Sequence, residues 1–291
     1  MKYIALYNPL AGNANGYSDV LDSLTWLYKD KLTVYNITEI ADYNELFSTL
    51  SVDDAVIICG GDGTLNRFIN DTEGVQINCD VLYFPSGTGN DFLHDLGKQS
   101  GDAPFSIKEY ITDLPTVEVN GKTYRFLNNV GFGIDGYCCE VGDEQKKTST
   151  KSVNYTAIAI KGLLFDYKPC GATITVDGTE YRYKKVWLAP TMKGRFYGGG
   201  MMAAPNQDRC NPDSTLSVML FHGAGSLRTL IAFPSIFKGE HIKHTKMVSI
   251  HTGSDISVKF DSPRAVQIDG ETIVGVTEYR ATSKILAKTD I

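Results

Sequence analysis

The stretch at residues 55–66, AVIICGGDGTLN, predicts how the first half of this chain folds. It begins with four apolar residues rich in β-branched side chains, the pattern of a short buried strand. The strand runs into the loop Gly60-Gly61-Asp62-Gly63-Thr64. Paired glycines allow positive φ and bring backbone N–H groups close to an oxyanion, and a helix that begins here adds free N–H donors. The stretch therefore predicts a phosphate-binding loop.

Asp62 is unusual in such a loop. A carboxylate repels phosphate oxygens unless a cation or a transferable proton lies between them, so Asp62 indicates bound Mg²⁺ or a general base. The alternative is a tight strand-to-helix turn in which Asp62 only caps the helix.

Composition limits the classes of protein to consider. The chain has 291 residues, 42% of them hydrophobic, enough for a substantial core in two domains or one large one. The formal net charge of −6, without a long basic block, disfavours nucleic-acid binding. Six cysteines lack metal-ligand spacing, which predicts reduced thiols in the cytoplasm. No signal peptide or transmembrane helix is expected, so any association with a membrane is transient.

Strand and helix patterns alternate around this stretch. Strands are predicted at 3–7, 32–37, 55–58 and 79–84, and helices at 20–28, 45–50 and 65–70. This alternation predicts a parallel sheet with covering helices. Small-residue loops follow the strands at Asn8-Pro9 and at 85–92. Because loops at the carboxyl ends of parallel strands converge, we expect these two loops and the Gly60 loop to line one nucleotide site.

The second half has a different pattern. Short runs rich in Val, Tyr, Phe and Thr predict an antiparallel β domain, with hairpin turns at Asn120-Gly121 and Asp177-Gly178. Two helical interruptions are expected, at 155–165 and 227–237. The domain boundary is predicted near Asn128. Strands are predicted at 115–120, 122–128, 172–176, 180–188, 215–221, 256–260 and 265–268.

Four motifs together resemble a known family: NPLAG at 8–12, GGDGTLN at 60–66, PSGTGNDF at 85–92 and IDGE at 268–271. They are similar to the catalytic domain of diacylglycerol kinases, and closest to the soluble bacterial lipid kinases of the superfamily that includes sphingosine and ceramide kinases. The resemblance extends over almost the whole chain. GGDGT alone also occurs in NAD kinases and phosphofructokinases, whereas GGDGTLN followed by PxGTxNDF is far more specific.

The resemblance implies a fold and an activity. The fold is an α/β N-terminal domain over 1–128, like NAD kinase and phosphofructokinase, and a mostly antiparallel β-sandwich lipid-substrate domain over 129–278, with 279–291 returning to the first domain. The activity is ATP- and Mg²⁺-dependent phosphorylation of diacylglycerol or a related lipid alcohol. The expected ATP contacts are Asn8, Pro9, Gly12, Thr38, Gly60, Gly61, Asp62, Gly63, Thr64, Leu65, Asn66, Gly87, Thr88, Asn90 and Asp91.

A structural Mg²⁺ site is also implied by the resemblance. The segment 198–215 is similar to the family segment that holds this ion with an Asp carboxylate and two backbone carbonyls. The expected ligands are Asp213 and the carbonyls of Cys210 and Thr215. The family usually has Gly where this chain has Ser214, and the alternative is an Asx-turn that binds no metal.

The IDGE motif completes the predicted catalytic set. Alone, Asp269-Gly270 is a hairpin turn. In company with the other motifs, Asp269 and Glu271 would lie on one side of an extended strand and face Asp62 across a cleft. We predict Asp62, Asp269 and Glu271 as the catalytic trio, which shares the roles of base and Mg²⁺ ligand, without an assignment of which residue does which.

Two further features leave alternatives open. Residues 131–136, GFGIDG, satisfy GxGxxG, but the acidic residue expected about twenty positions further on is missing and no parallel strand follows, which disfavours a dinucleotide fingerprint. The resemblance implies a substrate-side loop with Asp135 as a candidate site residue, and the alternative is a glycine-rich hinge turn. The apolar stretches 162–168 and 230–237, flanked by Lys161, Lys168 and Lys238, are either core helices or a surface that docks to anionic lipid.

Three functions remain open at this point. The first is a lipid kinase acting at a membrane surface. The second is an NAD kinase-like small-molecule kinase, which should lack PxGTxNDF and a C-terminal IDGE. The third is a non-catalytic nucleotide-binding protein of the same fold, against which the retained carboxylates argue. The sequence leaves the lipid and the oligomeric state, including a homodimer, open.

Overall fold

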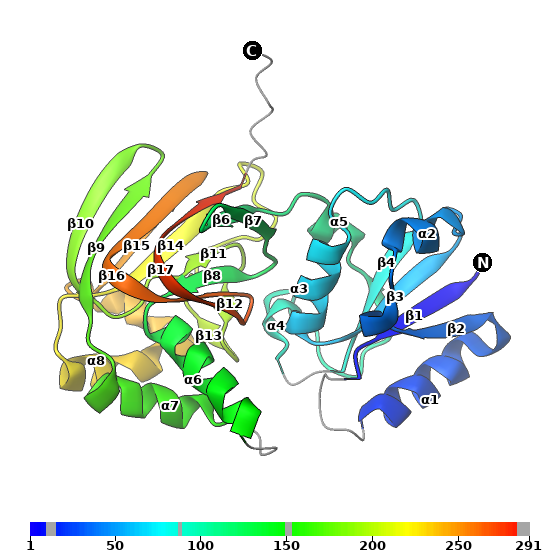
Figure 1. Ribbon diagram of the computed structural model, residues 1–291, viewed down its shortest axis with the longest axis horizontal. Helices are drawn as coiled ribbons and strands as arrows, with labels where there is room; N and C mark the ends of the chain where they lie inside the picture. The colour runs from blue at the N-terminus through cyan, green and yellow to red at the C-terminus, as the bar shows by residue number, and fades with distance from the viewer. Residues whose placement is uncertain (10–15, 87–88, 149–152, 284–291) are drawn as a thin grey trace, which may run out of the picture. The chain divides into compact units, whose positions relative to one another are not determined.

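The structure is a computed structural model that describes residues 1–9, 16–86, 89–148 and 153–283. It divides into two compact units between Leu114 and Pro115, earlier than the boundary predicted near Asn128. Figure 1 shows both units.

The first unit is the predicted α/β domain. Its sheet has the order β2-β1-β3-β4-β5, in which the first four strands are parallel and the short β5 is antiparallel to β4. The central β3 is buried along its whole length, which explains its unbroken apolar sequence. The strands are β1 (Tyr3–Tyr7), β2 (Leu32–Asn36), β3 (Ala55–Gly60), β4 (Asp80–Pro85) and β5 (Phe105–Ser106).

Helices of the first unit bury aromatic and aliphatic side chains against this sheet. Leu24 of α1 packs with Ala5, Ile57 and Cys59 in one cluster. Rings of Tyr43 and Phe47 from α2 and Phe68 from α3 pack in a second group. The helical segments are α1 (Gly16–Tyr28), η1 (Lys29–Lys31), η2 (Ile37–Glu39), α2 (Tyr43–Ser48), α3 (Asp62–Asp71), α4 (Asp91–Asp95) and α5 (Lys108–Thr112).

The second unit is the predicted antiparallel β-sandwich. One path of strands runs β15-β14-β11-β8-β16-β17-β6-β7, and the hairpin β9–β10 joins it at β16. Its core includes stacked rings of Phe132 and Phe260, 4.2 Å apart. The strands are β6 (Thr116–Val119), β7 (Lys122–Arg125), β8 (Asn129–Phe132), β9 (Cys170–Val176), β10 (Thr179–Val186), β11 (Thr191–Met192), β12 (Phe196–Tyr197), β13 (Met201–Met202), β14 (Leu216–Phe221), β15 (Val248–Gly253), β16 (Asp255–Ile268) and β17 (Glu271–Thr282).

The helices of the second unit differ in part from the sequence prediction. Residues 155–165 form α7 (Tyr155–Lys161) followed by the π-helical η3 (Gly162–Asp166), and 227–237 form α8 (Ser226–Ala232) followed by the 3-10 segment η4 (Phe233–Lys238). A second 3-10 segment, η5 (Glu240–Lys243), comes after them. The long α6 (Ile134–Thr148) was not predicted, because its second half is polar and lacks an apolar stripe. None of the helices in the described residues is long and apolar enough to cross a bilayer.

The glycines of GFGIDG serve packing between antiparallel elements. Strand β8 is antiparallel to both β11 and β16, so the parallel βαβ unit of a dinucleotide site does not form around it. Gly133 has φ of +123°, and a β-carbon on it would lie 2.5 Å from the Trp187 carbonyl. A β-carbon on Gly136 would lie 2.0 Å from the Ala265 carbonyl, so this glycine lets α6 rest directly on β16.

Strand β17 pairs with β6 in the sheet of the second unit. Residues 279–282 of β17 pair with 116–119 of β6. Residues 284–291, which belong to the segment predicted to return to the first domain, lie outside the described residues.

Candidate active site

Three loops meet at the carboxyl ends of β1, β3 and β4. The Asn8 amide donates to Thr64 Oγ1 at 3.3 Å, which joins the first loop to the second. The Gly60 carbonyl accepts from the Tyr83 hydroxyl and from the Ser86 N–H, both at 3.0 Å, which joins the second loop to the third. The three loops expected to line one nucleotide site are therefore joined by hydrogen bonds.

Asp62 is the buried centre of this arrangement. Its carboxylate accepts hydrogen bonds from the backbone N–H groups of Asp91, at 2.6 Å, and Phe92, at 3.2 Å. Its own N–H donates to the Gly89 carbonyl at 2.9 Å. Asp62 is the first residue of α3 and holds the first residues of α4, so it fixes two helix starts relative to each other. Asp62 therefore lies between the loops and connects them by hydrogen bonds.

The glycines of the Gly60–Gly63 loop do not adopt the positive φ that the sequence predicted. Gly61 is extended, with φ of −108°, and Gly60 and Gly63 do not adopt left-handed φ. A β-carbon on Gly60 would lie 2.3 Å from Thr64 Oγ1, so this glycine is required by close packing. By contrast, a β-carbon on Gly63 or Gly89 would meet no described atom within 4 Å, so both glycines face open space. That space beside the start of α3 suits a phosphate.

The other predicted ATP contacts differ in their burial and in their hydrogen-bond partners. Leu65 is fully buried, and the Asn66 carbonyl accepts from Asn70, so both support α3. Thr38 donates its N–H and hydroxyl to Asn36 Oδ1 within η2. Asn90 lies beside the loop, where its Oδ1 accepts from Tyr83 at 3.3 Å, and Pro9 is exposed. Gly12, Gly87 and Thr88 lie outside the described residues.

Asp269 is held by backbone groups of the second unit. Its carboxylate accepts from the N–H groups of Leu127 at 2.6 Å, Asn128 at 2.8 Å and Asn129 at 2.9 Å. Its own N–H donates to the Asn129 carbonyl at 3.0 Å. With a 9% exposed fraction, the carboxylate is committed to fixing the hairpin turn against 127–129.

Glu271 is the exposed member of the motif. The expectation that Asp269 and Glu271 share one side of an extended strand is not met, because Asp269 and Gly270 have positive φ, of 46° and 96°, and form the turn between β16 and β17. Glu271 begins β17 after this turn and is open to solvent. The two carboxylates therefore have different surroundings: one is buried in backbone contacts and one is accessible for reaction.

The predicted Mg²⁺ loop is closed by amide side chains. The Thr215 carbonyl accepts from Gln207 Nε2 at 2.8 Å and from Asn211 Nδ2 at 3.0 Å, which uses both of its lone pairs. Asn211 Oδ1 also accepts from the Thr215 N–H at 2.7 Å. Asp213 and Cys210 are exposed, and Ser214 adopts a left-handed φ of 51°. The loop as folded does not suit a cation bound by the Thr215 carbonyl.

Sequence reasoning missed one buried cation near Asp269. Arg209 donates to the Leu127 carbonyl and, at 2.7 Å, to Asn128 Oδ1. Residues 127–129 therefore donate their backbone N–H groups to Asp269, while oxygens of Leu127 and Asn128 accept from Arg209. A lone arginine in a polar loop gives no sequence signal for this role, because the contact joins residues more than eighty positions apart.

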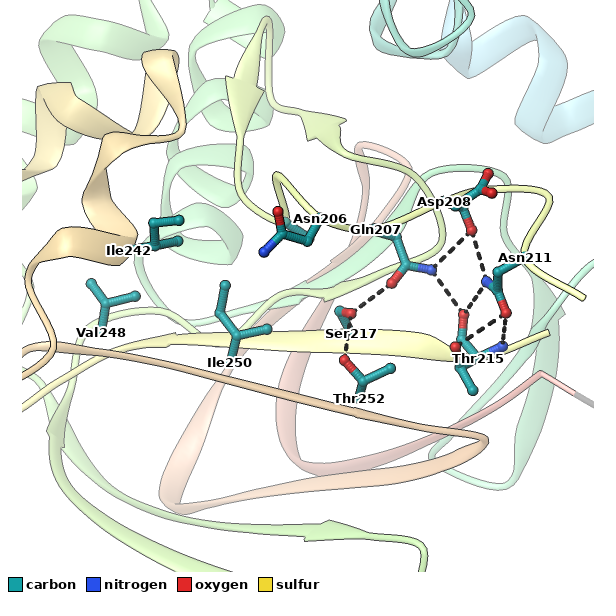
Figure 2. A pocket seen from close by; sticks show the side chains of 11 residues that line it. Asn206, Gln207, Asp208, Asn211, Thr215, Ser217, Ile242, Val248, Ile250 and Thr252 are labelled. Carbon is teal, nitrogen blue, oxygen red and sulfur yellow. Dashed lines mark hydrogen bonds between the residues drawn. The ribbon is translucent and has the colours of Figure 1, made fainter. Parts of the chain in front are cut away.

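A cavity of about 450 Å³ opens in the second unit beside the 206–215 loop. Figure 2 shows amide and hydroxyl side chains at one end, where Ser217 donates to Gln207 Oε1 at 2.6 Å and lies 3.0 Å from Thr252 Oγ1. The other end is apolar and is formed by Ile242, Val248 and Ile250. The cavity therefore has one polar end and one apolar end.

Comparison with known proteins identifies the family. The family described as "Diacylglycerol kinase catalytic domain" matches residues 2–117, and the family described as "YegS C-terminal NAD kinase beta sandwich-like domain" matches 128–283, more than half of the chain. The chain belongs to the diacylglycerol kinase-like family of lipid kinases.

Similar proteins agree with this family. A protein named diacylglycerol kinase from Mycobacterium tuberculosis (strain ATCC 25618 / H37Rv) is 26% identical to this lipid kinase over 254 residues, which cover 83% of this chain and 80% of that protein. A chain from Bacillus anthracis str. Sterne has a TM-score of 0.67 at 20% identity and covers 97% of this chain and 91% of its own. A crystal structure of a diacylglycerol kinase from the same strain has a TM-score of 0.59, also at 20% identity, and covers 97% and 93%. The structural matches confirm the fold of this lipid kinase.

Proposed function

We propose that this lipid kinase transfers the γ-phosphoryl group of MgATP to the hydroxyl of diacylglycerol or a related lipid alcohol. The observation that carries the proposal is the hydrogen-bonded junction of three loops around Asp62, in a chain whose first 117 residues match the diacylglycerol kinase catalytic domain. The open faces of Gly63 and Gly89 leave room for phosphates beside it.

The candidate carboxylates have separable roles in this proposal. Asp62 fixes the loops that would receive the phosphates, and its carboxylate would help to hold the Mg²⁺ that accompanies ATP. Glu271 accepts the proton of the attacking hydroxyl, because it is the carboxylate of the motif that the fold leaves exposed. Asp269 positions Glu271 by holding the turn that precedes it. Positioning and electrostatic stabilisation supply most of the rate.

The cavity of the second unit supports a lipid acceptor. A lipid alcohol has a polar head and an apolar chain, and the cavity has a polar end around Gln207 and Ser217 and an apolar end at Ile242 and Ile250. A pocket of a few hundred cubic ångströms suits part of such a molecule. We place the head at the amide end and the start of an acyl chain at the apolar end.

A second surface supports contact with a membrane. Segments η3 and α8 pack together and expose Phe165 (73%), Leu227 (67%) and Ile231 (73%), while Leu163 and Ala232 on their inner sides belong to the core. Each segment thus has one face in the core and one exposed apolar face. The two alternatives from the sequence, core helix and lipid-docking surface, therefore apply to opposite faces of the same segments. On and next to these segments, exposed cations that would attract anionic lipid are Lys161 of α7, Lys168 after η3, Arg228 of α8 and Lys238 of η4.

The test is a lipid-extract screen with radiolabelled ATP. Incorporation of label into a lipid hydroxyl in the presence of Mg²⁺ is expected, with none into NAD. Label transferred to NAD but to no lipid would replace the proposal with a small-molecule kinase. Transfer to neither would favour a nucleotide-binding protein without catalysis.

A further inference from the structure

Asp135 is a buried carboxylate that the proposed reaction does not use. It lies in the first turn of α6 with a 9% exposed fraction. Its Oδ1 accepts from the Gly136 N–H at 2.9 Å, which is an ordinary helix-start contact. Its Oδ2 is buried and accepts no well-aligned hydrogen bond among the described residues. Since solvent does not reach this oxygen, Asp135 acts through neighbouring protein groups.

Gln267 is the neighbour that connects Asp135 to the IDGE turn. A β-carbon on Gly131 would lie 2.0 Å from Asp135 Oδ2 and 2.4 Å from Gln267 Nε2, so both groups occupy the space above that glycine. At its other end, Gln267 Oε1 accepts from the Gly270 N–H at 2.7 Å. Gly270 directly precedes Glu271. The Gln267 amide therefore lies beside the buried carboxylate and is hydrogen-bonded to the turn. Burial raises the pKa of Asp135, and the Gln267 amide counters part of that rise by hydrogen bonding.

We infer that Asp135 is a positioning residue for Glu271, because it fixes the orientation of the Gln267 amide and thereby the hydrogen bond to Gly270. The inference rests on the proposed role of Glu271. An acceptor at Asp135 Oδ2 keeps the donor end of the amide toward α6, which leaves the acceptor end for Gly270. If the amide turns over, an NH₂ group faces the Gly270 N–H and the bond is lost.

A purely structural role does not explain this carboxylate. Burial raises the pKa of Asp135 to about 6, so at neutral pH the folded protein retains a charge that its surroundings disfavour. An asparagine would keep the contact with Gly136 without that cost. The titratable groups that respond to the charge are Cys138 and Cys139 on α6, Tyr167 after η3 and Tyr279 on β17. None of these four is a cation that would compensate it.

The test reverses which side chain donates and which accepts in the contact between Asp135 and Gln267. In Asp135→Asn, Oδ1 stays on Gly136 and the new NH₂ group faces Gln267, so the amide turns over. We expect kcat for the lipid to fall about 10- to 100-fold, with the KM for ATP unchanged and the midpoint of thermal unfolding raised at pH 8. In the double variant Asp135→Asn, Gln267→Glu, the new carboxylate accepts from both the new amide at position 135 and the Gly270 N–H, and most of kcat should return.

Three further readouts separate the outcomes. Wild-type kcat should fall below about pH 6, where a protonated Asp135 becomes a donor, and Asp135→Asn should lose this dependence. The control Glu144→Gln, which changes an exposed carboxylate on α6, should behave as wild type. Unchanged kcat in Asp135→Asn together with raised stability would overturn the inference.

The last measurement does not need activity. Hydrogen exchange at the Gly270 amide should be faster in Asp135→Asn and slow again in the double variant. If the wild-type protein phosphorylates no lipid, the proposed function fails while the exchange result still decides whether Asp135 sets the turn. Equal exchange in wild type and Asp135→Asn would overturn the inference whatever the activity.

Discussion

Asp269 and Asp177 make the same contact at two different hairpin turns. Each is followed by glycine, has a φ of 46° and donates its N–H to a carbonyl of a neighbouring segment, Asn129 for one and Asp255 for the other. Each carboxylate accepts N–H groups of that same segment. Asp177, Gly178 and Asp255 are not among the predicted site residues, so the same contact also fixes a hairpin in this sheet where no catalytic residue is predicted.

The different burial of these two turns predicts different effects of the same substitution at Asp269 and at Asp177. Asp269→Asn should lower the free energy of unfolding by about 2–4 kcal/mol, because a buried carboxylate that accepts three N–H groups is lost. Asp177→Asn, at an exposed turn, should cost about 1 kcal/mol and leave kinase activity unchanged. Denaturant unfolding with labelled-ATP assays measures both.

Glu271→Gln should show the opposite pattern. The side chain is exposed, so stability should stay within about 0.5 kcal/mol of wild type. Transfer to lipid should fall about 100-fold or more because the proton acceptor is removed. Binding of ATP, followed by isothermal titration calorimetry, should be unaffected. Full activity in this variant would transfer the role of base to another residue.

Asp62 should affect both activity and stability. Asp62→Ala is expected to abolish phosphoryl transfer while the protein remains folded, with a loss of about 1–3 kcal/mol because the N–H groups of Asp91 and Phe92 lose their acceptor. Circular dichroism and denaturant unfolding check the fold. Normal turnover on any lipid would refute the assignment.

The exposed apolar residues of η3 and α8, together with the exposed Phe237 of η4, which directly follows α8, predict membrane binding. Phe165→Asp and Phe237→Asp should each reduce co-sedimentation with vesicles of phosphatidylglycerol and phosphatidylcholine, and the reduction should be smaller with phosphatidylcholine alone. Val52→Asp, at an exposed residue of the first unit, is the matched control. Undiminished binding of both phenylalanine variants would retire the docking surface.

The amide-closed loop predicts that Mg²⁺ alone does not stabilise the protein. Without nucleotide, the midpoint of thermal unfolding should be equal in Mg²⁺ and in a chelator, whereas Asn211→Ala should lower the free energy of unfolding by about 1–2 kcal/mol. A rise with Mg²⁺ that Asp213→Ala removes would restore the metal site that the family resemblance implies.

Local sequence patterns predicted most of the fold and only part of the site. The apolar run of β3 and the Asn-Gly and Asp-Gly turns carry strong local signals, and they formed as expected. Helix α6 carries only a weak signal, because its second half is polar, its buried apolar residues Ile134 and Cys138 lie near its start, and its close contact with β16 is made at Gly136. Arg209 and Gln267 were missed because their partners are defined only after distant segments meet.

The resemblance located the acidic residues but did not separate their roles. From the motifs alone, Asp62, Asp269 and Glu271 are three carboxylates with no difference in predicted role. What distinguishes them is which backbone N–H groups each carboxylate meets, and that depends on the pairing of β8 with β16 and on the start of α4. Such differences follow from tertiary contacts, and the sequence of each motif does not contain them.

Of the six thiols, Cys210 is exposed to solvent, Cys139 and Cys170 are half-buried, and the other three are buried. Burial raises the pKa of Cys59, Cys138 and Cys139 to about 12, which keeps these sulfurs protonated and slow toward maleimides. Cys210 is exposed and lies in the loop beside the cavity of the second unit. A fluorophore attached there would report directly, without any engineered cysteine, when an amphiphile enters that cavity.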